Sequence, residues 1–402
     1  MELVSHGAVP GPLASCYRTP MLNHRTIRAF CAVVACLLSA CGEEAEPRSW
    51  GPMYAEVEDW LWTVGEDDDA LGDYQDGDWD PDWDDAPFYG LAFYASAGWS
   101  QGDAEYQQRA REAAAHNLEM ARAGLEDLTG EFLENISGIL YGTLGLIDYI
   151  AASGDTTGLE TVEDVIGMAD STIDLMGNYV QGYDNYATLT YGPTSISAIF
   201  ALINLQHAVL LDTDASDGFV ESAEAILEAI DTNAWNGTYY LFDPDEEERL
   251  DLYPNVAMII ALVRYHQATG DDDALQRAEA LYEAIQVLRY TDRPGYYSEY
   301  SAETMGAQTG DYTTLSSMNY LSLALALLHQ VTGDPGYRAE IDELITDFVQ
   351  GYLWVPGDGR VYHHWMDGRL AVPDDPEYYC IGCNLQLLYI IWWVHTNLDG
   401  TE

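Results

Sequence analysis

The sequence predicts an all-α fold, a closed (α/α)6 toroid of six helical hairpins, and three observations support this prediction. A helix-like apolar run ends in Gly-Asp four times, at Gly102, Gly154, Gly270 and Gly333. Within each pair of helices the first is apolar nearly all round, whereas the second carries one apolar stripe, which indicates an inner and an outer ring. The hairpins also number six if the first helix of the chain joins the last.

The Gly-Asp turns set the period of the repeat. Glycine suits the left-handed residue that ends a helix, and aspartate caps the helix that follows. The interval between the second and third turns spans about two periods, and we expect the segment from Asp212 to Gly218 to supply the missing turn.

The apolar runs are the predicted inner helices, because a helix without a polar face is buried. They cover residues 136–147, 196–205, 256–263, 321–328 and 385–394. The outer helices show single stripes, as in Leu275, Ala278, Leu281, Tyr282 and Ile285. Five hairpins begin near Pro87, Asn135, Thr194, Pro254 and Thr313, and the sixth inner helix, 384–396, would pair with 54–64. An open helical solenoid is the alternative, but it would need capping repeats.

The N-terminal 40 residues predict a leader, with Met21 as the better start. A basic region is followed by an apolar stretch over 29–38, which is the length of a signal sequence. It ends in Leu38-Ser39-Ala40-Cys41, which resembles the bacterial lipobox and implies lipidation of Cys41. We therefore expect a leader over 1–40, a lipidated cysteine and tether over 41–52, and one toroid domain over 53–402. The expected location is the cell envelope, periplasmic or surface-exposed on the outer membrane.

The charge of the chain is strongly acidic. After residue 40 it has 12 Arg, no Lys and 67 Asp plus Glu, which leaves a net charge of −55. This excludes nucleic acid as a partner. The acidic residues are typical of a solvated surface, as in a chain adapted to salty water. Disorder is excluded because 48% of the residues are hydrophobic and 12% are aromatic.

One local motif carries a family resemblance. The run from Trp83 to Ala92 begins Trp-Asp-Asp and continues as an aromatic helix towards Gly102-Asp103. It resembles the opening of the six-hairpin glycosidases, closest to the endo-α-1,6-mannanase family (glycoside hydrolase family 76). The segment from Pro254 to Asp271 resembles a later inner helix of that superfamily. The family's later Thr-Tyr-Asn-type motif is absent.

Asp84 and Asp85 are the catalytic candidates, since glycoside hydrolysis uses two carboxylates. Adjacent residues at a helix start point about 100° apart, so they can occupy two sides of a cleft. The alternative is simple N-capping.

Aromatic loops provide the candidate sugar-binding residues. Turn-and-aromatic hairpins are expected over 235–240, 294–297 and 354–365, with a fourth aromatic loop over 179–191. Aromatic rings beside carboxylates suit sugars, although the same rings can simply plug the mouth of the barrel. The substrate-binding candidates are Trp83, Tyr89, Tyr191, Trp235, Tyr239, Tyr253, Tyr296, His363, His364 and Trp365.

Two further clusters allow several interpretations. Residues 66–85 contain ten Asp, and Asp76, Asp78, Asp80 and Asp82 are candidate calcium ligands, although a solvated acidic loop explains the same pattern. Cys380 and Cys383 suit a short disulfide, a redox pair, or a zinc site with His363 and His364. The lanthionine cyclases build zinc into a similar toroid, but their Cys-His dipeptide is absent.

The sequence thus favours a lipid-anchored, monomeric protein that acts on a poly- or oligosaccharide, as a glycoside hydrolase. We expect no required cofactor, with calcium as the one candidate ion. A sugar epimerase or isomerase on the same toroid is the enzyme alternative. A non-catalytic glycan- or partner-binding lipoprotein is the alternative from another class.

Overall fold

The computed structural model describes most of the chain downstream of the leader. The described residues are 50–66, 73–75, 78–80, 85–126, 136–180, 186–244, 249–301, 306–307, 313–357, 359–362, 364–366, 369–370 and 381–399. They belong to one compact unit, 49–402, so the predicted leader and Cys41 lie outside them.

Six helices form a closed inner ring. They are α3 (Asp85–Gln101), α6 (Ile136–Ser153), α8 (Tyr186–Leu210), α10 (Leu252–Thr269), α12 (Leu315–Thr332) and α14 (Ile381–Val394). Each helix contacts the next in this order, and α14 returns to contact α3. The predicted toroid is therefore confirmed, and the open solenoid is wrong.

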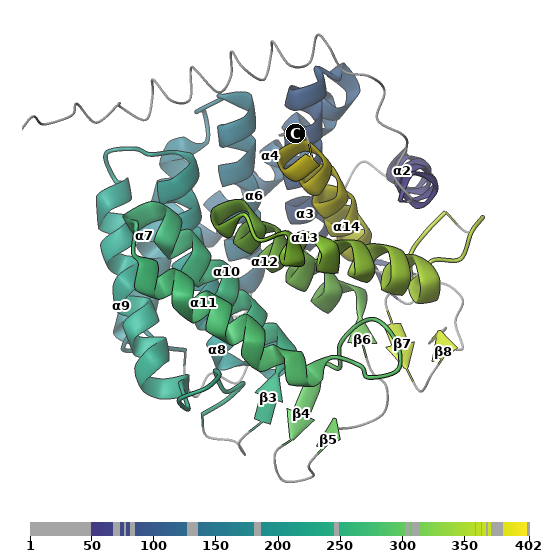
Figure 1. Cartoon of the computed structure of the whole chain (residues 1–402). Coiled ribbons are helices and arrows are strands. Elements are labelled where there is room, and N and C mark those ends of the chain that lie inside the picture. Colours follow the sequence, from purple (N-terminus) through teal and green to yellow (C-terminus); the bar gives the residue numbers. More distant parts are fainter. Residues whose placement is uncertain are drawn as a thin grey trace, which may run out of the picture. The chain divides into compact units, whose positions relative to one another are not determined.

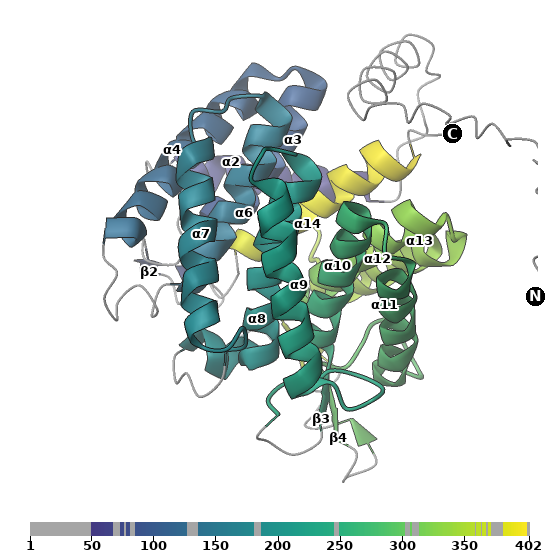
Figure 2. The ribbon, with the colours of Figure 1, turned by 90° about the vertical axis from the view of Figure 1, so that its left-hand side faces the viewer.

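An outer helix covers each inner one (Figures 1 and 2). The outer helices are α2 (Gly51–Glu66), α4 (Ala104–Glu126), α7 (Leu159–Leu175), α9 (Ser216–Ala234), α11 (Asp272–Ile285) and α13 (Pro335–Asp342). Helix α13 continues in the π-helical segment η2 (Glu343–Leu353). Helix α2 packs against α14, so the first helix completes the last hairpin, as predicted. Two short segments, η1 (Gln286–Leu288) and η3 (His395–Asp399), extend α11 and α14.

The burial pattern follows from the two kinds of helix. In α10 every residue from Asn255 to Val263 is buried, whereas α11 buries only Ala274, Ala278, Leu281 and Ile285. An inner helix is surrounded by neighbours and an outer helix faces water on one side, which explains the all-round and striped patterns.

The four Gly-Asp turns have the predicted glycine conformation, and three of them also have the predicted aspartate cap. Gly102, Gly154, Gly270 and Gly333 have φ between 71° and 77°. In three of the turns the aspartate accepts a backbone N–H from the first turn of the next outer helix, for example Asp271 from Asp273 at 2.9 Å. Asp155 instead accepts from Thr157, two residues before α7 begins. In the fifth turn Asp212 itself takes the left-handed conformation, with φ 50°.

Helix α8 contains a kink that divides it into two parts. Gly192 has φ 79° and ψ 152°, and Pro193 follows it, so the inner helix proper starts near Thr194, as predicted. Its stretch Gly192–Leu210 is long and apolar enough to cross a membrane, but 78% of it is buried in the toroid. We therefore read it as a core helix.

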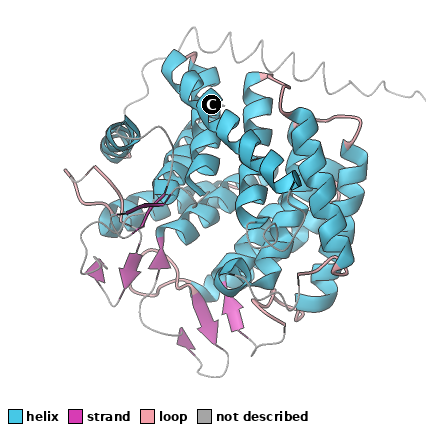
Figure 3. Cartoon of the chain, turned by 180° about the vertical axis from the view of Figure 1, so that it is seen from behind, coloured by secondary structure: helices cyan, strands magenta, loops and turns pink. Residues whose placement is uncertain are grey.

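Short strands gather at the N-terminal end of the inner ring (Figures 1 and 3). One sheet has the order β3 (Arg249–Asp251), β4 (Glu299–Ser301), β5 (Gly306–Ala307), and another has β6 (Thr313–Thr314), β7 (His364–Met366), β8 (Arg369–Leu370). All pairs are antiparallel, as in the separate pair β1 (Asp73–Gln75) and β2 (Asp78–Asp80).

The three predicted aromatic hairpins are also present. Antiparallel bridges join Trp235 to Tyr240, Arg289 to Tyr296 and Trp354 to Val361. Each hairpin contains a glycine in the left-handed region, Gly237, Gly295 or Gly357, which is the residue that such turns require.

Candidate active site in the axial cavity

The inner ring encloses a partly open cavity of about 60 Å³ along its axis, and all six inner helices contribute to its lining. The lining residues are Ala92, Tyr141, Leu144, Asp148, Ala198, Ile199, Leu202, Gln206, Tyr253, Ala257, Ile260, Arg264, Tyr320, Leu323, Leu327, Gln386 and Tyr389. The cavity begins near the first turn of α10, at Tyr253, and reaches Arg264. At 1.5 Å per residue these two positions are about 16 Å apart along the helix.

Three tyrosines, which we call the entrance ring, meet at the end of the cavity near the strands: Tyr141, Tyr253 and Tyr320. The hydroxyls of Tyr141 and Tyr253 are hydrogen-bonded at 2.9 Å. The rings of Tyr253 and Tyr320 meet edge to face, with centroids 5.0 Å apart. Aromatic faces with polar edges suit a ligand that is apolar on its ring face and hydroxylated at its rim.

Four polar side chains, which we call the floor, line the cavity farther along the axis: Asp148, Gln206, Arg264 and Tyr389. Gln386 also lines the cavity, but it is the sixth residue of α14 and lies nearer the entrance ring. Gln206 donates to Asp148 Oδ1 at 3.0 Å, and Arg264 Nη1 donates to Gln267 at 2.8 Å. Gln386 is only 2% exposed, yet its Oε1 has no hydrogen-bond partner, and neither has Arg264 Nε. Between floor and entrance ring the wall is apolar.

Burial controls the charges at the floor. It raises the pKa of Asp148 to about 6, although the positive charge of Arg264 and the hydrogen bond from Gln206 oppose this shift. Burial also lowers the pKa of Arg264 and raises that of Tyr389. A carboxyl group with a pKa near neutrality in a cavity is typical of a functional site.

The loops above the cavity are fixed by polar residues at the starts of inner helices. Asn255 accepts a hydrogen bond from the backbone N–H of Tyr240 and donates to its carbonyl, both at 2.9 Å. Asn384 makes the same two bonds to Val361, at 2.9 and 3.0 Å. The aromatic hairpins are thereby held at one end of the ring.

Of the two catalytic candidates, only the backbone of Asp85 is described, and it belongs to this same end. Asp85 is the first residue of α3, whose N-terminus lies with those of the other inner helices. Its side chain, and all of Asp84 and Trp83, lie outside the described residues. The backbone of Tyr89 is in α3, but its side chain is likewise undescribed.

Among the aromatic candidates, Tyr253 lines the cavity, but Trp235 and Tyr296 have other partners. The Trp235 ring packs against Tyr240 at 4.9 Å and against the guanidinium of Arg277 from α11 at 4.7 Å. Tyr239 from the same hairpin is half-buried against the core. These two residues lie in the packing between the hairpin and the helices.

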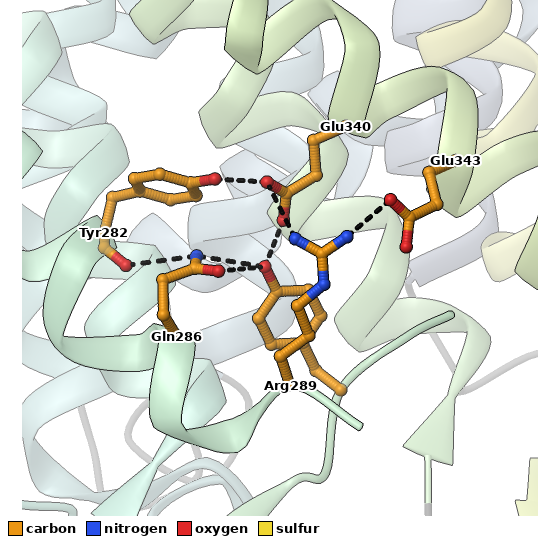
Figure 4. A network of polar contacts seen from close by, with 6 residues as sticks. Tyr282, Gln286, Arg289, Glu340 and Glu343 are labelled. Atoms are coloured by element: carbon orange, nitrogen blue, oxygen red, sulfur yellow. Dashed lines mark hydrogen bonds and ion pairs between the residues drawn. The ribbon is translucent and has the colours of Figure 1, made fainter. Parts of the chain in front are cut away.

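Tyr296 is 1% exposed, so its ring has no surface left for a ligand. Its hydroxyl donates to Glu340 of α13, which also binds Tyr282 and lies 3.7 Å from Arg289 (Figure 4). Arg289 reaches on to Glu343. This network joins α11 to the last outer helix. Tyr296 therefore has a structural role, and the prediction that it contacts the sugar is wrong.

The other candidates are only partly described. Tyr191 precedes the kink at Gly192, and His364 and Trp365 are in β7, with their side chains undescribed. Asp78 and Asp80 are in β2, whereas Asp76, Asp82 and His363 lie outside the described residues. Within the described part of the chain, no three His, Cys, Asp or Glu side chains form a metal cluster. Calcium binding remains a prediction.

Cys383 is buried in the first turn of α14 and is disulfide-bonded. Its predicted partner, Cys380, lies outside the described residues. Cys383 is thus not a free thiol in this structure, but its pairing with Cys380 remains a prediction.

The floor residues were missed by the sequence analysis. Their signal is the polar interruption of an apolar helix: Asp148 is the only charged residue in α6, and Arg264 is the only one in α10. Such a residue cannot face the apolar neighbours of its helix without a large cost, so it marks the face that looks into the cavity.

Comparison with known proteins supports the fold. No protein-family model and no curated protein sequence matches the chain. Among solved structures, a D-mannose isomerase has a TM-score of 0.63 at 11% identity, covering 89% of this chain and 100% of the other.

Two hydrolases are similar to the same extent. The unsaturated glucuronyl hydrolase of Bacillus sp. GL1 has a TM-score of 0.63 at 12% identity, covering 87% of this chain and 96% of that one. The family 76 α-mannanase of Bacteroides thetaiotaomicron has a TM-score of 0.60 at 13% identity, covering 86% and 96%. At these identities the likeness establishes the shared toroid.

Proposed function

We propose that this chain, which has the toroid fold of the six-hairpin glycosidases, is a glycoside hydrolase that uses Asp84 and Asp85. One observation carries the proposal: α3 starts at Asp85, at the end of the ring where the entrance tyrosines begin the axial cavity. The backbone of Asp85 and a tyrosine-lined cavity thus belong to the same end of the ring.

The chemistry needs one carboxyl group to protonate the leaving oxygen and a second to act as nucleophile or base. Tyr141, Tyr253 and Tyr320 would contact the ring of the sugar and orient its hydroxyls. Structural neighbours that act on sugars, among them the α-mannanase and the glucuronyl hydrolase, support a carbohydrate as the ligand.

The test is hydrolysis of a panel of polysaccharides by the purified protein and by its Asp84→Asn and Asp85→Asn variants. Each substitution should lower turnover by roughly 10²–10⁴-fold, the contribution of a general acid or base. Asp103→Asn is the matched control, because Asp103 caps α4, an outer helix, at its N-terminus. It should change stability little, because Asn caps a helix about as well as Asp, and it should keep its activity.

A sugar isomerase or epimerase is the second candidate, favoured by the likeness to D-mannose isomerase and to a sugar epimerase. Incubation with free D-mannose, followed by chromatography of the products, separates the two. Conversion of the free sugar without release of reducing ends from any polysaccharide would replace hydrolysis by isomerisation. Binding without either reaction would leave the non-catalytic alternative.

We also propose that Cys41 carries a lipid that anchors the protein in the cell envelope. The support is the sequence around Leu38-Ser39-Ala40-Cys41 and the compact unit that begins at residue 49, a few residues downstream.

A further inference from the structure

The turn between α8 and α9 is built differently from the four Gly-Asp turns. Its left-handed residue is Asp212, with φ 50°, whereas each of the other four places a glycine in that region. A residue with a Cβ is less favourable in this conformation, which glycine adopts freely. We therefore looked for contacts from outside the turn that help to hold it.

Side chains from a neighbouring outer helix and from the end of α8 hold this turn. Glu163 of α7 accepts a hydrogen bond from the hydroxyl of Thr213 at 2.8 Å. Its Oε1 also lies 3.3 Å from Nε2 of His207, in the last turn of α8. Thr213 Oγ1 in turn accepts the backbone N–H of Ala215 at 3.2 Å, just before α9 begins. One carboxylate thus joins the end of α8 to the start of α9.

The imidazole of His207 is enclosed by protein. The residue is 0% exposed, and its ring meets Phe219 of α9 edge to face, with centroids 4.7 Å apart. Because a carboxylate can only accept, the hydrogen bond to Glu163 requires the proton of the neutral ring to be on Nε2. Nδ1 is also buried and has no hydrogen-bond partner. A proton added to Nδ1 would therefore find neither an acceptor nor water.

Glu163 is the charged group that acts on His207. Burial lowers the pKa of His207, and the carboxylate of Glu163 opposes this shift. Asp170 of α7 and Asp148 of α6 accept hydrogen bonds from other residues of α8, and Arg264 of α10 donates within its own helix. Helix α9 faces His207 with an aromatic ring, and the acidic residues of the turn itself are exposed.

From these contacts we infer that His207, Glu163 and Thr213 form a pH-sensitive latch, which holds the α8–α9 turn at neutral pH and releases it as the pH falls. An opened turn exposes the imidazole to water, where it can take up a proton that the closed turn resists. Opening is therefore linked to proton uptake. Below the ordinary histidine pKa of 6.5, the equilibrium constant for opening rises by at most about tenfold per pH unit.

Release of the latch would reach the axial cavity through the residue before His207. Gln206 donates to Asp148 Oδ1 at 3.0 Å, and both side chains line the cavity. A loosened end of α8 therefore loosens a partner of Asp148. The latch would thus make the order of this lining depend on pH, independently of any ligand.

The experiment is hydrogen exchange of the full chain at pH 7.5 and 5.5, followed by mass spectrometry of peptides that cover residues 207–219. Each rate is divided by the intrinsic rate of an unstructured peptide at the same pH, so that only opening is compared. We expect opening of this segment to rise roughly two- to tenfold at pH 5.5. The corresponding turn over 266–275 should change less than twofold.

Two substitutions test the residue itself. His207→Gln keeps a donor for Glu163, and His207→Phe keeps the ring contact with Phe219, but neither side chain titrates in this range. Each should therefore abolish the rise. His266→Gln is the matched control, because His266 occupies the last turn of α10 and its Nδ1 bonds to the backbone carbonyl of Asp271 at 2.9 Å. The rise over 207–219 should remain in that variant.

The parent protein alone can overturn the inference, so it does not depend on the folding of a variant. A rise of less than twofold over 207–219 would show that the turn does not open with proton uptake. An equal rise over 266–275 would mean that the whole fold loosens and that no local latch exists. A rise that persists in either folded His207 variant would assign the effect to another group.

Discussion

At the scale of single residues, Asp148 is the clearest sign of a function beyond folding. Its carboxyl group lines the axial cavity inside the ring, and burial outweighs both Arg264 and Gln206 in setting its pKa at about 6. A group whose pKa is raised on folding is harder to ionise in the native state than in the unfolded chain. Asp148 therefore lowers stability at neutral pH, which a residue retained only for packing would not do.

We predict that Asp148→Asn stabilises the protein at pH 8 and not at pH 4. The folded pKa of about 6 exceeds the ordinary value of 3.8, so the protonated carboxyl favours folding. This contribution is complete below pH 4 and is lost as the pH rises to 6. The gain at pH 8 is at most about 3 kcal/mol, since one pKa unit corresponds to about 1.4 kcal/mol.

The measurement is chemical unfolding of the parent and the variant at both pH values. Asp231→Asn is a useful control, because Asp231 binds Tyr240 and Arg277 outside the cavity. A variant that is less stable than the parent at pH 8 would show that Asp148 is needed as the counter-charge of Arg264.

At the scale of elements, the starts of the inner helices explain how irregular loops are fixed above the cavity. Asn255 and Asn384 occupy the fourth position of their helices and pair with a hairpin backbone as a β-strand would. Thr194 and Thr313 donate to the carbonyls of Leu241 and Tyr296, both at 2.6 Å. The same solution is thus repeated around the ring.

We predict that Asn255→Ala destabilises the protein by roughly 2–4 kcal/mol, because it leaves the buried N–H and carbonyl of Tyr240 without partners. Asn233→Ala is the matched control. Asn233 is exposed and bonds only within its own helix, so its loss should change stability by no more than about 0.5 kcal/mol. Equal effects of both changes on the unfolding midpoint would contradict the role of the Asn255 side chain.

Much of the architecture could be predicted because helix period and turn chemistry are local properties. The Gly-Asp turns and the two kinds of helix follow from them, and the pairing of α2 with α14 follows from the count of hairpins that a closed ring requires. The partners of an aromatic residue depend on tertiary packing. The sequence alone therefore could not show that Tyr253 lines the cavity, whereas Tyr296 donates a hydrogen bond to Glu340.

At the scale of the whole molecule, charge is the dominant property. The chain has a net charge of −53, with 15 arginines and no lysine. Many of the arginines are held in place: Arg277 binds Asp231 and stacks on Trp235, and Arg338 binds Asp342 and stacks on Trp50. Most surface carboxylates therefore repel one another, which destabilises the compact state.

We predict that raising NaCl from 0.1 to 1 M increases the Tm, because the Debye length falls from about 10 to about 3 Å. Chloride is preferable to sulfate, since sulfate strengthens apolar burial in any protein. Sucrose at matched osmolality is the control for solvent exclusion. A Tm that is unchanged or lower in 1 M NaCl would mean that repulsion between carboxylates does not limit stability.

The proposed lipid anchor makes the N-terminus responsible for the position of the protein in the cell. We predict that Cys41→Ser releases the protein from the membrane fraction without changing its Tm, because stable anchoring requires the acyl chains on this cysteine. The folded unit begins only at residue 49, so the variant should fold. Immunoblots of membrane and soluble fractions provide the measurement. Retention of Cys41→Ser in the membranes would refute the lipid anchor.

The most direct test of the proposed function is the release of reducing ends from a polysaccharide panel by the parent and by Asp84→Asn, measured side by side. We predict that the parent cleaves at least one polysaccharide and that the variant does so roughly 10²–10⁴-fold more slowly, with an unchanged far-UV spectrum. An Asp84→Asn variant with the turnover of the parent, or a folded parent that cleaves none of the panel, would contradict the assignment.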